Sequence, residues 1–169
     1  METQTKKLKV YCETSFWSWL ASDPATAPAK AIRQAYTHKW WQEVAPLCDI
    51  FVSQHVFDEA QRGDARLAER RYRLYSGQKQ LDGYFDDVVS LAQLLQNGHA
   101  VPENETTDAL HIATAAYYGM DVLLTWNCRH MANPITLPKT ATIIVKAGYD
   151  CPAIMTPHQF LEHREEFEI

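Results

Sequence analysis

The stretch LKVYCETS, residues 8–15, joins a short apolar run to an acid and two hydroxyl residues. The run over residues 8–12 predicts a strand, and Thr14 and Ser15 are suitable caps for a helix that follows it. Glu13 then stands where the strand ends. Ligands of parallel sheets bind outside the carboxyl ends of the strands, so Glu13 is a candidate functional group.

Three further stretches place one metal-capable side chain beside an apolar run, and these side chains are Glu59, Asp108 and Asn127. Glu59 lies on the helix expected after a strand over residues 49–53, and Asn127 follows a strand expected over residues 122–125. Buried carboxylates repel each other and are costly to desolvate. A cluster of them therefore predicts a hard cation, Mg²⁺ or Mn²⁺.

The rest of the chain continues the alternation of short strands and helices. Helices are expected over about residues 30–44, 55–62, from 64 onward, 88–96, 105–118 and from 156 onward, with a further strand over 142–145. This alternation predicts an α/β fold with a mainly parallel central sheet flanked by helices. The length of 169 residues predicts one domain over residues 1–169.

The composition is that of an ordinary soluble globular protein, with 46% hydrophobic and 22% charged residues. No apolar run reaches the roughly 18 residues that cross a bilayer. The N-terminal residues lack the apolar core of a secretory signal, so we expect a cytoplasmic protein without a membrane partner. Four scattered cysteines without a Cys-x-x-Cys pair give a zinc site little support. The net charge of -5 argues against a large nonspecific nucleic-acid surface but leaves a nuclease possible, because acids at a metal site contribute to that charge.

Taken together and in this order, the motifs resemble the PIN domain, and the branch they are most similar to is the VapC-type toxins of bacterial toxin–antitoxin pairs. The resemblance rests on ETS at residues 13–15, FDEA at 57–60 with RGD at 62–64, DALHIA at 108–113 and LTWNCRH at 124–130. It extends from about residue 10 to residue 160. It implies a three-layer PIN-like fold.

The resemblance also implies a chemistry, that of a Mg²⁺- or Mn²⁺-dependent endoribonuclease that hydrolyses RNA phosphodiester bonds. The catalytic, metal-binding quartet of the family falls on Glu13, Glu59, Asp108 and Asn127, and the assisting hydroxyl falls on Thr14 or on the neighbouring serine. A cation lowers the pKa of bound water and neutralises charge on the phosphoryl oxygens. The implied partners are an RNA substrate, a cognate antitoxin and a second copy of the chain in a homodimer.

Two positions depart from the family pattern. The first acid is usually Asp, whereas Glu13 is one methylene longer, and the fourth is often Asp, whereas Asn127 is neutral. The missing charge predicts one well-bound cation and a weak or absent second one. These departures leave open an inactive PIN-like module that binds RNA or protein. A similar acidic pocket would also suit a phosphatase or a DNA nuclease.

Substrate contacts are expected from Ser15, Arg129 and His111. Each candidate also has an ordinary interpretation. His111 fits a buried histidine with satisfied hydrogen bonds, and Arg129 fits an ion pair with an acid of the site. Glu13 fits a cap of the following helix, and Asn127 fits a turn residue that binds its own backbone.

Two larger groups of side chains have alternative interpretations. A positive stripe at helical spacing is either a solvated face or a rim that guides RNA, and it consists of Arg62, Arg66, Arg70 and Arg73. An aromatic group is too large to lie wholly in the core, so part of it is expected at a subunit or antitoxin interface. Its members are Phe16, Trp17, Trp19, Trp40 and Trp41.

Overall fold

The computed structural model describes residues 6–169, and its centre is a five-stranded sheet in the order β3-β2-β1-β4-β5. The strands are β1 (Leu8–Cys12), β2 (Cys48–Ser53), β3 (Lys79–Leu81), β4 (Val122–Leu124) and β5 (Ala153–Met155). All four neighbouring pairs are parallel, and Val10 of β1 is paired with Ile50 on one side and Val122 on the other. The parallel α/β sheet predicted from the sequence is therefore confirmed.

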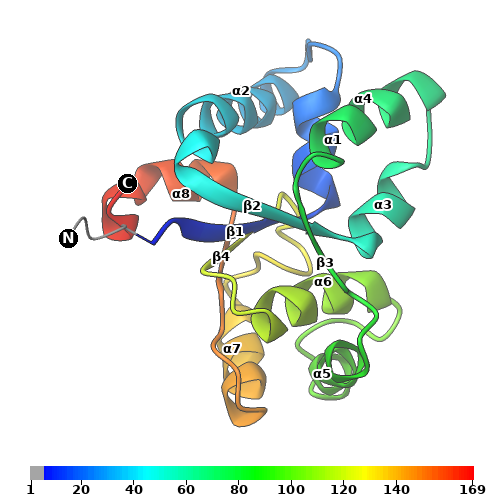
Figure 1. Cartoon of the computed structure of the whole chain (residues 1–169), viewed down its shortest axis with the longest axis vertical. Helices are drawn as coiled ribbons and strands as arrows, with labels where there is room; N and C mark the ends of the chain where they lie inside the picture. Colours follow the sequence, from blue (N-terminus) through cyan, green and yellow to red (C-terminus); the bar gives the residue numbers. More distant parts are fainter. Residues whose placement is uncertain (1–5) are drawn as a thin grey trace.

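Helices cover both faces of this sheet and complete a three-layer fold. They are α1 (Thr14–Ala21), α2 (Pro28–Glu43), α3 (Gln54–Ala60), α4 (Ala65–Tyr75), α5 (Asp86–Asn97), α6 (Thr106–Tyr117), α7 (Leu137–Lys146) and α8 (Pro157–Glu162), with short 3-10 turns at Ala45–Leu47 and Arg164–Phe167. In Figure 1, α1, α2, α4 and α8 lie on one side of the sheet and α5, α6 and α7 on the other. Across residues 6–169, none of the helices combines the length and the apolar character needed to span a membrane.

The strand expected over residues 142–145 is wrong, because these residues belong to α7. The β-branched, apolar run is typical of a buried strand, and so short a run does not distinguish a strand from a helix. In the helix, Thr140 and Ile144 lie four residues apart on the buried face, while Val145 is 63% exposed. The sheet instead gains β5 and the edge strand β3, whose three residues KQL lack any strand-like pattern.

The aromatic group forms a core on the α1–α2 side of the sheet. Phe16, Trp17 and Trp40 are completely buried, and the rings of Phe16 and Trp40 meet edge to face at 5.4 Å. The indole Nε1 of Trp17 donates to the carbonyl oxygen of Cys12 at 3.0 Å, which ties α1 to the end of β1. These three residues belong to the core, so the interface role expected for part of the group stays a prediction for its other members. The burial of the three leaves only the half-buried Trp19 and Trp41 with accessible surface.

The three members of the arginine stripe that lie on α4 form surface ion pairs. Arg66 and Arg70 bind the two oxygens of Asp23 at 2.5 and 2.7 Å, and Arg73 binds Glu69 at 2.9 Å. Hydrogen bonds from the two arginines lower the pKa of Asp23 to about 2. These pairs pin the loop after α1 to α4, which favours the solvated-face interpretation over an RNA-guiding rim.

Candidate metal centre

The carboxyl ends of β1 and β4 are tied together, and this brings distant motifs to one edge of the sheet. The backbone N–H of Glu13 donates to the carbonyl of Leu124 at 3.2 Å. Two residues further along both segments, the backbone N–H of Trp126 donates to the hydroxyl of Ser15 at 2.8 Å. The hydroxyl of Ser15 therefore has a structural role, because it links the first motif to the turn that carries Asn127.

Glu13 is the N-cap of α1, as its ordinary interpretation expected. Its Oε1 accepts the backbone N–H of Ser15 at 3.0 Å, and the hydroxyl of Ser15 donates to the same oxygen. The residue is only 5% exposed, and this burial raises its pKa, with His111 and Ser15 opposing the shift. A buried carboxylate whose charged form is disfavoured is one that a nearby cation would stabilise.

Glu59 is held by two donors from different elements. The hydroxyl of Thr14 donates to Oε1 at 2.8 Å, and Nε2 of His111 donates to the same oxygen at 2.5 Å. On the far side of the imidazole, Nδ1 hydrogen-bonds the hydroxyl of Tyr11 at 2.7 Å, and that hydroxyl bonds Ser53 at 2.7 Å. A chain of four side chains thus runs from Glu59 into the core.

His111 is therefore a positioning residue for Glu59, and its expected role as a substrate contact is not supported. Its side chain is 1% exposed and both ring nitrogens are engaged, so no surface remains for a substrate. Burial alone would lower the pKa of His111 and raise that of Glu59. Their mutual hydrogen bond and the charges around them together outweigh burial, so the pKa of His111 is raised and that of Glu59 is lowered. The pair therefore favours an ionised carboxylate at the sheet edge.

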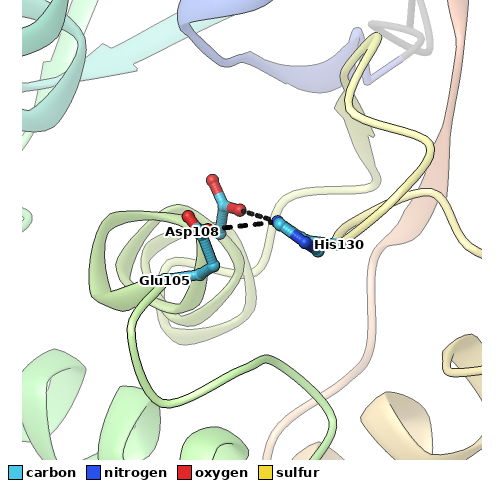
Figure 2. Close-up of side chains that lie close together, drawn as sticks. All are labelled: Glu105, Asp108 and His130. Atoms are coloured by element: carbon cyan, nitrogen blue, oxygen red, sulfur yellow. Dashed lines mark hydrogen bonds and ion pairs between the residues drawn. The ribbon is translucent and has the colours of Figure 1, made fainter.

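Asp108 lies in a second hydrogen-bonded group at the start of α6, shown in Figure 2. Oδ2 of Asp108 lies 3.2 Å from Nδ1 of His130, and Oε1 of Glu105 lies 3.7 Å from the same nitrogen. Burial raises the pKa of Asp108, opposed by His111, Asn127 and His130. Ligand atoms of Glu105, Asp108 and His130 all lie within 4.8 Å of one another.

Asn127 joins this group with its nitrogen rather than its oxygen. Its Nδ2 donates to Oδ2 of Asp108 at 2.9 Å, while its Oδ1 accepts the backbone N–H of His130 at 3.0 Å. The turn-residue interpretation of Asn127 is thus realised. The metal-ligand role predicted for its carbonyl oxygen would require the side chain to rotate away from the turn.

The sequence prediction did not include Glu105 or His130 among the ligands. Glu105 precedes Asp108 by three residues at the start of a helix, a spacing that puts both acids on one face. His130 follows Asn127 by the same interval. Arg129, a predicted substrate contact, is exposed and forms no ion pair with an acid of residues 6–169.

The Glu105–Asp108–His130 group fits a divalent cation. Ligand atoms at about 2.1 Å from an ion lie up to about 4 Å apart, so atoms already within 4.8 Å need only small movements. Carboxylate oxygens suit Mg²⁺ and Mn²⁺, and the imidazole favours a transition metal such as Mn²⁺. Among the residues that the structure describes, Glu13 and Glu59 are not part of this group. The expected quartet therefore divides into two groups, linked electrostatically through His111, whose pKa responds to Glu13, Glu59 and Asp108.

Comparison with known proteins agrees with the fold and the motifs. A family model of the PIN domain matches residues 10–130, so the chain belongs to the PIN domain family, a family of nucleases. Among solved structures, the fold is similar to that of VapC20 from Mycobacterium tuberculosis, a sarcin–ricin loop cleaving toxin. The TM-score is 0.55 and the identity 18%, over 83% of this chain and 95% of that chain. No curated protein sequence matches the chain.

Proposed function

We propose that this PIN-domain protein is a divalent-metal-dependent endoribonuclease that hydrolyses RNA phosphodiester bonds. The observation that carries the proposal is the Glu105–Asp108–His130 group at the carboxyl edge of a PIN-family sheet. Two carboxylates placed this close together repel each other when both are ionised. A cation bound between them and the imidazole would remove this repulsion. A bound Mn²⁺ or Mg²⁺ would supply Lewis acidity and lower the pKa of water.

The neighbouring group supplies the protein's own part of the reaction. Oε1 of Glu59 is saturated by Thr14 and His111, whereas Oε2 has no hydrogen bond from any residue between 6 and 169. Oε2 is therefore free to accept a hydrogen bond from the attacking water and orient it. Thr14 and His111 keep the carboxylate ionised and fixed in direction, which is the assisting role proposed for Thr14.

The biological context that we propose is the toxin component of a toxin–antitoxin pair in the cytoplasm. The similarity of the fold to VapC20, itself a toxin, supports this context. In such a pair the partners would be an RNA substrate, a cognate antitoxin that covers the acidic site, and a second copy of the chain. The single PIN-like domain over residues 1–169 would contain the whole catalytic site.

A cleavage assay on single-stranded RNA in Mn²⁺ tests the activity. We expect cleavage by the wild type, none in EDTA, and a loss of at least about 100-fold for Asp108→Asn, because the variant removes charge at the centre. Asp87→Asn is a matched control, since Asp87 is an exposed acid in the first turn of α5, as Asp108 is an acid in the first turn of α6. Wild type that cuts no RNA across a broad panel, or that cuts only single-stranded DNA or phosphate monoesters, would refute the proposal.

A further inference from the structure

We propose that a pocket beside the metal centre binds one nucleotide of the RNA strand next to the phosphate that is cut. The pocket has a volume of about 270 Å³ and is lined by His99, Pro102, Arg129, His130 and Thr136, among others. The identity of the strand as RNA rests on the proposed function. The existence of a nucleotide site does not depend on that function, because it is argued from the pocket and the residues that line it.

His130 places the pocket directly next to the centre, because it belongs to both. Its Nδ1 faces Asp108 and Glu105, while its Nε2 has no hydrogen bond from residues 6–169. The imidazole thus has one edge on the acids and one nitrogen available to a ligand. A strand whose scissile phosphate lies at the acids would bring its neighbouring nucleotide to this pocket.

The side chains around the pocket suit a phosphate with a base attached. Arg129 is an exposed guanidinium without an acid partner in residues 6–169, in a chain whose net charge is -5. A guanidinium with no acid to satisfy it is well suited to a bidentate phosphate contact. The hydroxyl of Thr136 and the two imidazoles add hydrogen-bonding groups that read base or sugar edges.

The volume of the pocket and the side chain of His99 in its lining favour a single nucleotide over a larger ligand. A volume of 270 Å³ is just below the range of about 300–1,000 Å³ typical of small-molecule pockets. His99 lines the pocket, and unstacked bases of single-stranded RNA commonly stack on aromatic side chains, histidine included.

The backbone at His99 gives independent support. His99 follows the end of α5 with φ of 56°, in the left-handed region where helix ends most often place glycine. The N–H of His99 bonds Gln96, and that of Ala100 bonds Leu95, both at 2.9 Å, so the turn holds this conformation. A histidine at this position costs more conformational free energy than glycine, and such residues cluster at functional sites.

An NMR titration of the full chain in EDTA tests binding without cleavage. The probes are uridine and adenosine 5′-monophosphate, with inorganic phosphate as the comparison. We expect either nucleotide at millimolar concentration to shift the backbone amides of residues 99–101 and 129–136, and phosphate to shift them much less. Absence of shifts there, shifts confined to another surface, or equal shifts with phosphate alone would overturn the nucleotide site.

Two variants link these shifts to the side chains. Arg129→Gln and His99→Gly should each weaken nucleotide binding by roughly tenfold, the effect of losing one charge-assisted or stacking contact. Glycine relieves the left-handed conformation, so His99→Gly should keep the melting temperature of the wild type and exclude misfolding as the cause. Arg73→Gln, in an exposed pair with Glu69, is the control and should bind as the wild type does.

Steady-state cleavage in Mn²⁺ separates this proposal from the proposed function. For Arg129→Gln we expect KM to rise roughly tenfold with kcat within about twofold, because Arg129 would bind the neighbouring nucleotide and not the phosphate that is cut. A fall in kcat at unchanged KM would overturn the subsite. If the wild type cuts no RNA, the endoribonuclease proposal fails, while the titration in EDTA still decides whether the nucleotide site exists.

Discussion

At the scale of single residues, the site is controlled by which partner each carboxylate has. Glu59 hydrogen-bonds a buried imidazole, and its pKa is lowered. Glu13 is buried and Asp108 is half-buried, and burial raises the pKa of both carboxyls. The pKa values differ in direction because Nε2 of His111 hydrogen-bonds Glu59 and neither of the other two carboxyls. A nearby cation would therefore stabilise the ionised forms of Asp108 and Glu13 most.

The Glu59–His111 pair should make the free energy of unfolding depend on pH, with its largest contribution within a limited pH range. Glu59 has a folded pKa below its ordinary 4.5, so its contribution is present above that value and is lost as pH falls through the folded pKa. His111 has a folded pKa above its ordinary 6.5, so its contribution is complete below that value and is lost as pH rises through the folded pKa. The pair should therefore stabilise the fold most between 4.5 and 6.5.

Urea unfolding of Glu59→Gln in EDTA measures this window. The variant should lose about 2 kcal/mol of unfolding free energy near pH 5.5, a value typical of a hydrogen bond between charged groups, and less on either side. Glu69→Gln, which removes an exposed pair with Arg73, should lose little at any of these pH values. A deficit for Glu59→Gln that is constant with pH would show that the pair is not ionised in the folded protein.

Asn127→Asp tests the departure from the family pattern. The substitution replaces the donor to Asp108 by a second carboxylate, so the metal-free protein should lose about 1–3 kcal/mol of stability. Mn²⁺ should then raise the melting temperature of the variant more than that of the wild type, and calorimetry should find a second binding event. Equal Mn²⁺ responses of the two proteins would mean that Asn127 does not limit the second cation.

At the scale of elements, local signals predicted some boundaries well and others not at all. Thr156 and Pro157 predicted the start of α8 correctly, because a capping residue and a proline at the first helical position act locally. The TIIV run in α7 was misread because its burial is decided by packing against α5 rather than by the run itself. Strand β3 was missed because three edge residues acquire strand structure only by pairing with β2.

The capping box of α8 offers a test at this scale. Thr156 accepts the backbone N–H of Gln159 at 3.1 Å, and Gln159 returns a bond to the N–H of Thr156 at 2.9 Å. Thr156→Ala should therefore reduce the unfolding free energy by about 1 kcal/mol. Thr142→Ala on the exposed part of α7 is the matched control, expected within about 0.5 kcal/mol of the wild type. Equal effects of the two substitutions would contradict a stabilising role for the box.

At the scale of the whole molecule, parallel topology explains why the sequence alone predicts that motifs far apart along the chain meet at one edge of the sheet. Glu13 and Asn127 follow β1 and β4, neighbouring strands whose ends must lie together. Topology does not predict the direction in which each side chain points. The spacing of the motifs does not show that the side-chain oxygen of Asn127 accepts the backbone N–H of His130. It also does not show that Glu105 lies beside the imidazole of His130.

A titration of Mn²⁺ into the metal-free protein, followed by electron paramagnetic resonance, tests most directly whether the Glu105–Asp108–His130 group is a cation site. We expect one tight Mn²⁺ in the wild type, affinity reduced by roughly 10–100-fold in Asp108→Asn, and no change in the Asp87→Asn control. Tight binding that persists in Asp108→Asn, or no binding by the wild type, would contradict the account.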